Sequence, residues 1–290
     1  MSQKVLITGA AGQLGQELQR TAPAGLQLLA LGRDGLDITD AQQVQGFFAE
    51  HRPALVINAA AYTAVDKAES EPEQAMAVNC KAAANLAGAC ADTDARLFHV
   101  STDFVFDGSA STPYQPDAPA APLGEYGRSK LAGEQAVLQA LPSAMIMRTA
   151  WVYSAFGGNF VKTMLRLMAE RDELSVVVDQ VGTPTWARGL AQALWLAAER
   201  DEMQGIYHWS DAGVCSWYDF AVAIAEEAVD MGLLERQPLI HPIPGSAYPT
   251  PASRPAFSVL DKTSTWQALE IEGLHWREQL RSMLQDLKEL

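Results

Sequence analysis

Short apolar runs alternate with amphipathic segments through the first half of the chain. The apolar runs are typical of buried strands and cover residues 4–8, 26–31, 54–60 and 96–101. Segments with helical spacing follow them, at residues 12–22, 41–51, 71–91 and 126–140. This alternation predicts an α/β fold with a doubly wound parallel sheet that helices cover on both faces. Ligands of such sheets bind at the carboxyl ends of the strands.

The second half of the chain is less regular. After an apolar run at 144–153 come short strand patterns at 205–211 and 238–243, and helical patterns at 185–200, 216–232 and 275–287. A loop rich in Pro and Ser, residues 244–255, interrupts them. We expect residues 1–150 to form a nucleotide-binding domain and residues 151–290 a smaller C-terminal substrate-binding region. Whether the segment at about 184–200 packs back on the first domain stays open.

Composition restricts the functional classes. The 290 residues are 48% hydrophobic and 19% charged, which is the balance of a soluble globular protein. A net charge of −14 argues against nucleic acid as a partner, so an anionic substrate needs a local basic pocket. No apolar stretch approaches the ~18 residues of a membrane span. The three cysteines have no pair or metal spacing, and this predicts a reducing cytoplasm.

A glycine-rich loop joins the first predicted strand to the first predicted helix. In TGAAGQLG, Gly9, Gly12 and Gly15 form a GxxGxxG array. Glycines there permit a tight turn and let the backbone approach a pyrophosphate, which rests on the helix N-terminus. The spacing alone is weakly specific, and a bare strand-to-helix turn also explains it. The strand before the loop and the helix after it favour a Rossmann-like dinucleotide site.

The end of the second predicted strand bears on the choice of cofactor. Arg33 stands at the strand tip, where it suits the 2′-phosphate of NADP(H), and Asp34 behind it leaves NAD(H) open. Asp37 is placed to meet an adenine amino group. Its alternative is a loop role beside Thr39 and Gln42, which have the spacing of a capping pair.

Tyr126 and Lys130 have the spacing of an acid–base pair. Carbonyl reduction needs a proton donor, and a tyrosine with its ordinary pKa near ~10 needs a nearby cation to ionise. Residues four apart share a helix face, so Lys130 can assist Tyr126 and touch a nicotinamide ribose. Such pairs are common by chance. Ser101, Thr102 and Asp103 add weight because they leave a strand at the sheet edge of the glycine loop, and a polar turn closed by Asp107 and Gly108 is the alternative interpretation.

Eight segments carry a resemblance to a known family. They are GAAGQLGQEL, NAAAYTAVDKAESEPEQAMAVN, STDFVFDG, YGRSKLAGE, RTAWVY, NFVKTML, DQVGTPT and AYPTPASRPAFSVLD. Running from residue 9 to 261, they resemble the extended short-chain dehydrogenases/reductases, and within these the branch of the dTDP-4-dehydrorhamnose reductases. AVDKAESEP and PTPASRP are specific to this branch, whereas the glycine loop is not.

The resemblance implies a function. It is the NADPH-dependent reduction of the C4 carbonyl of dTDP-4-dehydro-L-rhamnose to dTDP-L-rhamnose, which feeds cell-surface polysaccharide biosynthesis. NADH is the alternative cofactor. Another nucleotide-sugar reductase or epimerase of the same fold is the nearest rival function. A non-catalytic regulatory subunit is a second rival, against which the Tyr126–Lys130 pair argues.

The resemblance also implies roles for individual residues. The catalytic set falls on Thr102, Tyr126 and Lys130. The cofactor set falls on Gly12, Gln13, Leu14, Asp37, Ile38, Ala60, Ala61, Tyr62, Ser101, Tyr126 and Lys130, and the glycine array and the strand tip add Gly9 and Arg33 to it. The substrate set falls on Thr102, Asp103 and Trp151, to which we add Arg254 from the Pro-bracketed loop. Trp151 is otherwise a core tryptophan, and Arg254, our candidate for the diphosphate, is otherwise a rim arginine without a ligand.

One position departs from the family pattern. Some members dimerise through magnesium held by glutamates on facing helices, and Glu17 has the matching identity. Arg188 stands where the second glutamate would be, and an arginine does not ligate a hard cation. We therefore expect no metal site, and the resemblance leaves a homodimer open.

Overall fold

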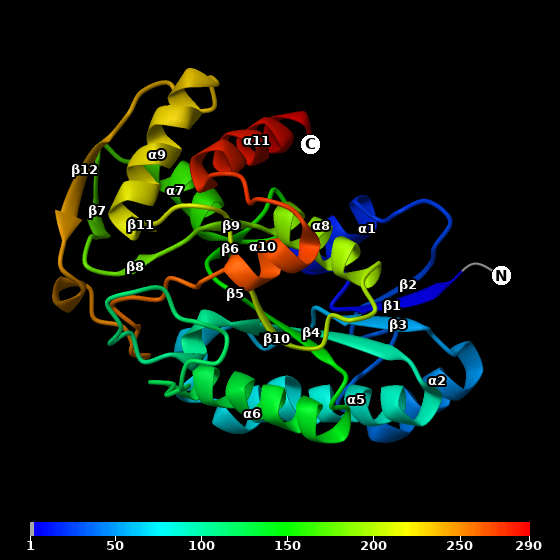
Figure 1. Ribbon diagram of the computed structural model, residues 1–290. Coiled ribbons are helices and arrows are strands. Elements are labelled where there is room, and N and C mark those ends of the chain that lie inside the picture. The colour runs from blue at the N-terminus through cyan, green and yellow to red at the C-terminus, as the bar shows by residue number, and fades with distance from the viewer. Residues whose placement is uncertain (1–2) are drawn as a thin grey trace.

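A computed structural model describes residues 3–290 (Figure 1). Its central sheet has six parallel strands in the order β10-β5-β4-β3-β1-β2. The bounds of these strands are β1 Lys4–Thr8, β2 Gln27–Leu31, β3 Leu55–Asn58, β4 Arg96–Thr102, β5 Met145–Thr149 and β10 Gly205–Trp209. The predicted parallel α/β sheet is confirmed. β10, from the second half of the chain, lies at its edge beside β5.

Helices cover both faces of this sheet (Figure 1). On one face lie α2 (Ala41–His51), α5 (Ala82–Thr93) and α6 (Glu125–Ala140), and on the other lie α1 (Gln13–Arg20), α8 (Ala187–Ala198) and α10 (Thr263–Leu269). Alternate residues of β1 serve the two cores, since Leu6 faces one while Val5 and Ile7 face the other. Burial on both faces explains why these strands are apolar throughout.

A smaller lobe packs beside the sheet (Figure 1). It contains α7 (Phe160–Glu170), α9 (Trp217–Asp230), α11 (Trp276–Glu289) and the parallel pair β7 (Glu173–Val177) and β12 (Leu239–Ile243). Its core joins the inner faces of the three helices to both strands. α8 packs on α1 although it follows residue 150, so the two halves of the chain interleave. The division at residue 150 stays a prediction.

The remaining elements are short. They are α3 (Val65–Ala68), α4 (Pro72–Met76), a π-helical turn (Ala77–Lys81), 3-10 turns at Asp103–Val105 and Gly245–Ala247, β6 (Val152–Tyr153), β8 (Val181–Gly182), β9 (Thr185–Trp186) and β11 (Cys215–Ser216). In the described residues, no helix has the length and apolar character needed to cross a membrane.

Candidate active site

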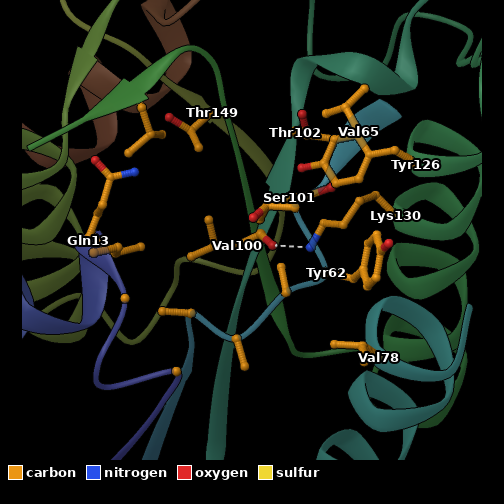
Figure 2. Close-up of a pocket in the computed structure, with 18 of the residues that line it drawn as sticks. Gln13, Tyr62, Val65, Val78, Val100, Ser101, Thr102, Tyr126, Lys130 and Thr149 are labelled. Atoms are coloured by element: carbon orange, nitrogen blue, oxygen red, sulfur yellow. Dashed lines mark hydrogen bonds between the residues drawn. The ribbon is translucent and has the colours of Figure 1, made fainter. Parts of the chain in front are cut away.

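A cavity of about 1000 Å³ lies at the carboxyl edge of the sheet. Every residue that the sequence assigned to the catalytic, cofactor and substrate sets lines it. Figure 2 shows Tyr126 and Lys130 on one wall, Thr102 beside the tyrosine, and Gln13 across the cavity. The sheet brings these residues together because parallel strands all end at the same edge.

The glycine loop makes a tight turn at the N-terminus of α1. Gly9 has φ +68°, in the left-handed region that favours glycine, and a Cβ there would lie 2.7 Å from the Ala60 nitrogen. A Cβ on Gly15 would collide with the Gly9 carbonyl oxygen. The N-cap residue of α1, Gly12, has no side-chain capping bond, so the first N–H groups of the helix are left for a ligand. These features fit a pyrophosphate at the helix N-terminus.

Arg33 and Asp37 lie together at the far end of the cavity. The Arg33 side chain is 73% exposed, and its Nε lies 3.4 Å from Asp37 Oδ2. Asp37 accepts bonds from the Thr39 hydroxyl and backbone N–H, which hold the pKa of its carboxyl below the ordinary value. The Thr39–Gln42 capping pair is wrong. Asp40 caps α2 instead, because its carboxylate accepts from the Gln42 and Gln43 N–H groups.

Tyr126 and Lys130 project from the first turns of α6. Burial raises the pKa of Tyr126 to about 12, against a lowering by the Thr102 hydroxyl. The sequence suggested instead that Lys130 lowers this pKa. Burial lowers the pKa of Lys130 to about 8, and its amine donates to the Val100 carbonyl at 2.7 Å (Figure 2). Tyr126 is therefore protonated at neutral pH, which is the form that a proton donor needs.

Thr102 and Asp103 line the cavity next to Tyr126. The Thr102 hydroxyl donates to Asp103 Oδ1 at 3.0 Å and accepts from the Phe104 N–H. Burial raises the pKa of Asp103 to about 6, with bonds from Ser258 and Thr102 acting in the opposite direction. The carboxylate and hydroxyl can thus hold hydroxyl or carbonyl groups of a substrate that reaches Tyr126.

Buried contacts fix α6 against the sheet. Arg148 on β5 binds both oxygens of Glu134 at 2.9 and 2.7 Å, and both side chains are almost fully buried. Its third bond goes to the Pro116 carbonyl. The pair fixes α6, the helix that carries Tyr126 and Lys130, against β5.

Trp151 lies between the sheet and the smaller lobe. It is not glycine, yet its φ is +47°, a strained value that is often found at functional sites. Its ring stacks on Trp217 at 3.5 Å between centroids, with the planes 6° apart. The two indoles form an apolar wall of the cavity.

Arg254 is held by an acidic partner from the first half of the chain. Its guanidinium donates to both Asp66 oxygens, at 3.1 and 2.8 Å, which lowers the pKa of that carboxyl. Arg254 and Trp217 also line a second hollow of about 960 Å³, with Gln180, Tyr248 and Thr250 on its wall. Both hollows are therefore lined by Arg254, whose guanidinium is paired with Asp66.

The family described as RmlD substrate binding domain matches residues 3–289. The chain belongs to this family.

Individual relatives agree with that membership. A dTDP-4-dehydrorhamnose reductase from Streptomyces griseus is 47% identical over 95% of this chain and 91% of its own. A probable dTDP-4,6-dihydroxy-2-methyloxan-3-one 4-ketoreductase from Streptomyces antibioticus is 43% identical over 97% of this chain and 95% of its own. A solved dTDP-4-dehydrorhamnose reductase from Bacillus anthracis in complex with NADP is 36% identical, with a TM-score of 0.93 over 99% of this chain and 100% of that one. The predicted family, Rossmann-like fold and oxidoreductase class are confirmed.

Arg188, the position that departs from the family pattern, forms an ion pair with Glu17 within this chain. Arg188 Nε lies 3.0 Å from Glu17 Oε2, and the Ser154 hydroxyl donates to the other carboxylate oxygen. Arg188 also binds Asp286, which Arg20 binds in turn. The network ties α1 and α8 to α11. The expectation of no metal site at Glu17 stays a prediction.

Sequence reasoning missed several residues of the site. Trp217 follows Ser216, whose capping box with Asp219 is visible in the sequence but does not reveal the ring's contact with Trp151. Asn79, in the π-helical turn, is buried and binds both backbone groups of Tyr62. A π turn inside an Ala-rich helical segment leaves no period that a pattern could detect.

Proposed function

We propose that this protein reduces the C4 carbonyl of dTDP-4-dehydro-L-rhamnose with NADPH, yielding dTDP-L-rhamnose. The observation that carries the proposal is the placement of Tyr126, Lys130 and Thr102 on one wall of the cavity whose floor is the glycine loop. The relatives named dTDP-4-dehydrorhamnose reductase, and the relative solved with NADP, support the substrate and the cofactor.

Each residue of the site has a separate role in the reaction. When bound at the glycine loop, the reduced nicotinamide supplies a hydride to C4 of the sugar. Tyr126 donates its phenolic proton to the carbonyl oxygen, so the carbonyl becomes an alcohol. Thr102 orients that oxygen toward Tyr126, and Lys130 donates to the nicotinamide ribose while its charge stabilises the phenolate. Trp151 and Trp217 cover the deoxysugar and exclude water from it.

The second hollow accommodates the nucleotide end of the substrate. Arg254 stands where the two hollows meet and takes the diphosphate, with the sugar toward Tyr126 and the nucleoside beside Tyr248 and Thr250. Asp66 presets the guanidinium, so little side-chain freedom is lost when the substrate binds.

Replacing Arg254 by Gln removes this cation. We expect KM for the nucleotide sugar to rise by about 10- to 100-fold, the usual worth of a hydrogen bond to a charged group, while KM for NADPH stays within twofold. Steady-state kinetics with each substrate varied in turn checks this. Arg236→Gln, on the exposed side of the smaller lobe, is the control and should change neither KM. An unchanged KM in Arg254→Gln would remove the residue from the substrate site.

The choice of NADPH over NADH is tested at Arg33. We expect Arg33→Gln to lower kcat/KM for NADPH by about tenfold through the lost contact with the 2′-phosphate. The same constant for NADH, which has no such phosphate, should hold within twofold and serves as the internal control. Equal losses with both cofactors would show that Arg33 does not select between them.

The assay for the function follows NADPH oxidation with dTDP-4-dehydro-L-rhamnose and with its GDP- and UDP-linked counterparts. We expect the dTDP sugar to be preferred. A second candidate is reduction of another dTDP-4-keto sugar, which the 43% identity to the Streptomyces antibioticus 4-ketoreductase favours. Faster turnover of a different dTDP-4-keto sugar would select that candidate. A cytoplasmic location and a homodimer remain predictions.

A further inference from the structure

Three buried polar side chains form a line across the sheet beneath the catalytic lysine. Thr8, Asn58 and His99 are direct partners on the neighbouring strands β1, β3 and β4, and each is at least 98% buried. The Thr8 hydroxyl donates to Asn58 Oδ1 at 2.7 Å, and Asn58 Nδ2 lies 2.9 Å from His99 Nδ1. His99 Nε2 then lies 3.5 Å from the Lys130 amine. The proposed mechanism gives this line no role.

The line fixes which nitrogen of His99 carries a proton. Asn58 Oδ1 also accepts from the Ala60 backbone N–H at 3.2 Å, and a backbone N–H can only donate. The amide therefore turns its NH₂ group toward His99, whose Nδ1 must accept. Burial and the Lys130 charge lower the pKa of His99 well below its ordinary value, so the ring is neutral. Its single proton is left on Nε2, the atom that faces Lys130.

An N–H group that faces an amine disfavours the protonated form of that amine. An ammonium group has only donors, so it is repelled by the N–H of His99, whereas a neutral amine can accept from it. Two carboxyl groups also lie in this part of the site, those of Glu134 and Asp103. Glu134, bound by Arg148, raises the pKa of Lys130, and Asp103 acts on Tyr126. Tyr126 itself is uncharged at neutral pH.

We propose that His99 is a positioning residue, held by Asn58 and Ala60 in the tautomer that points Nε2–H at Lys130, and that it weakens the hold of the lysine on its proton. The inference rests on the proposed function only in giving Lys130 a part in proton delivery. This role explains why polar side chains occupy the three paired positions on β1, β3 and β4.

The tautomer is read directly by ¹⁵N NMR of the protein labelled at histidine. We expect a bare Nδ1 and a protonated Nε2 in His99 between pH 6 and 9. A proton on Nδ1, or a ring that titrates in this range, overturns the proposal whether or not the protein proves to be a reductase.

The effect on Lys130 is read by ¹³C NMR of lysine-labelled protein without substrate, in wild type and in His99→Phe. We expect the Lys130 titration midpoint to rise by about 0.5 to 1 pH unit when the N–H is lost. The alkaline limb of kcat/KM against pH should move by the same amount. His208→Phe, which changes a buried histidine on β10 outside the cavity, should move neither. An unmoved or lowered midpoint in folded His99→Phe refutes the proposal. A moved midpoint without any reductase activity leaves the proposal standing and refutes the function.

Discussion

Replacing Tyr126 by Phe is expected to lower kcat by about 10²- to 10⁴-fold, the usual contribution of a positioned general acid. The substitution removes only the phenolic oxygen, and the ring keeps its edge-to-face contact with Phe104. Folding should be intact because the ring keeps its packing and the hydroxyl that is lost is uncharged at neutral pH. Pre-steady-state reduction of the keto sugar, with circular dichroism as a check of folding, measures the loss.

Tyr114→Phe provides the matched control for that result. Tyr114 is also buried, and its hydroxyl bonds Asp107, but it lies outside the residues that line the cavity. We expect its kcat to stay within about twofold of wild type, because the lost hydroxyl does not line the cavity. Equal activities of the two variants would show that Tyr126 is not the proton donor.

Replacing Arg148 by Met should give the largest loss of stability. The change leaves Glu134 buried with no partner, and breaking such a pair costs about 3–5 kcal/mol of the free energy of unfolding. The Pro116 carbonyl loses a donor as well. Urea unfolding followed by circular dichroism gives the difference. Because the pair holds α6 on β5, the residual folded enzyme should also have lower kcat.

Arg166→Met separates burial from charge in the same experiment. Arg166 pairs with Glu170 on α7, with both side chains more than half exposed. Solvent screens such a pair, so the free energy of unfolding should hardly change. Similar losses for Arg148→Met and Arg166→Met would contradict the view that the buried pair anchors the catalytic helix.

The sequence predicts those parts of the fold that depend on local pattern. β1, α2 and α6 begin and end within a residue of their expected bounds because apolar period and flanking residues are local signals. The apolar run at 144–153 reads as one strand, whereas the structure breaks it at Trp151, where φ is positive. No local signal marks that break. α7 and β7 are not among the elements that the sequence pattern predicts.

In the site, too, the sequence predicts the residues that local patterns mark and misses the contacts that depend on tertiary packing. The glycine loop and Thr102 could be named because strand ends of a parallel sheet converge, and Tyr126 and Lys130 because residues four apart share a helix face. The Arg254–Asp66 pair joins residues 188 positions apart, and the stacking of Trp151 on Trp217 depends on how the smaller lobe packs. The line from Thr8 to His99 depends on strand register. Contacts of this kind are set by tertiary packing, for which a single sequence holds no period.

The central claim, hydride delivery to C4 of a dTDP-4-keto sugar, is tested most directly with NADPH deuterated at C4 of its nicotinamide. Incubation with dTDP-4-dehydro-L-rhamnose should oxidise one NADPH for each sugar consumed and place one deuterium at C4 of dTDP-L-rhamnose, as seen by NMR and mass spectrometry. Conversion of the sugar without NADPH oxidation, or a product without deuterium at C4, would contradict the account.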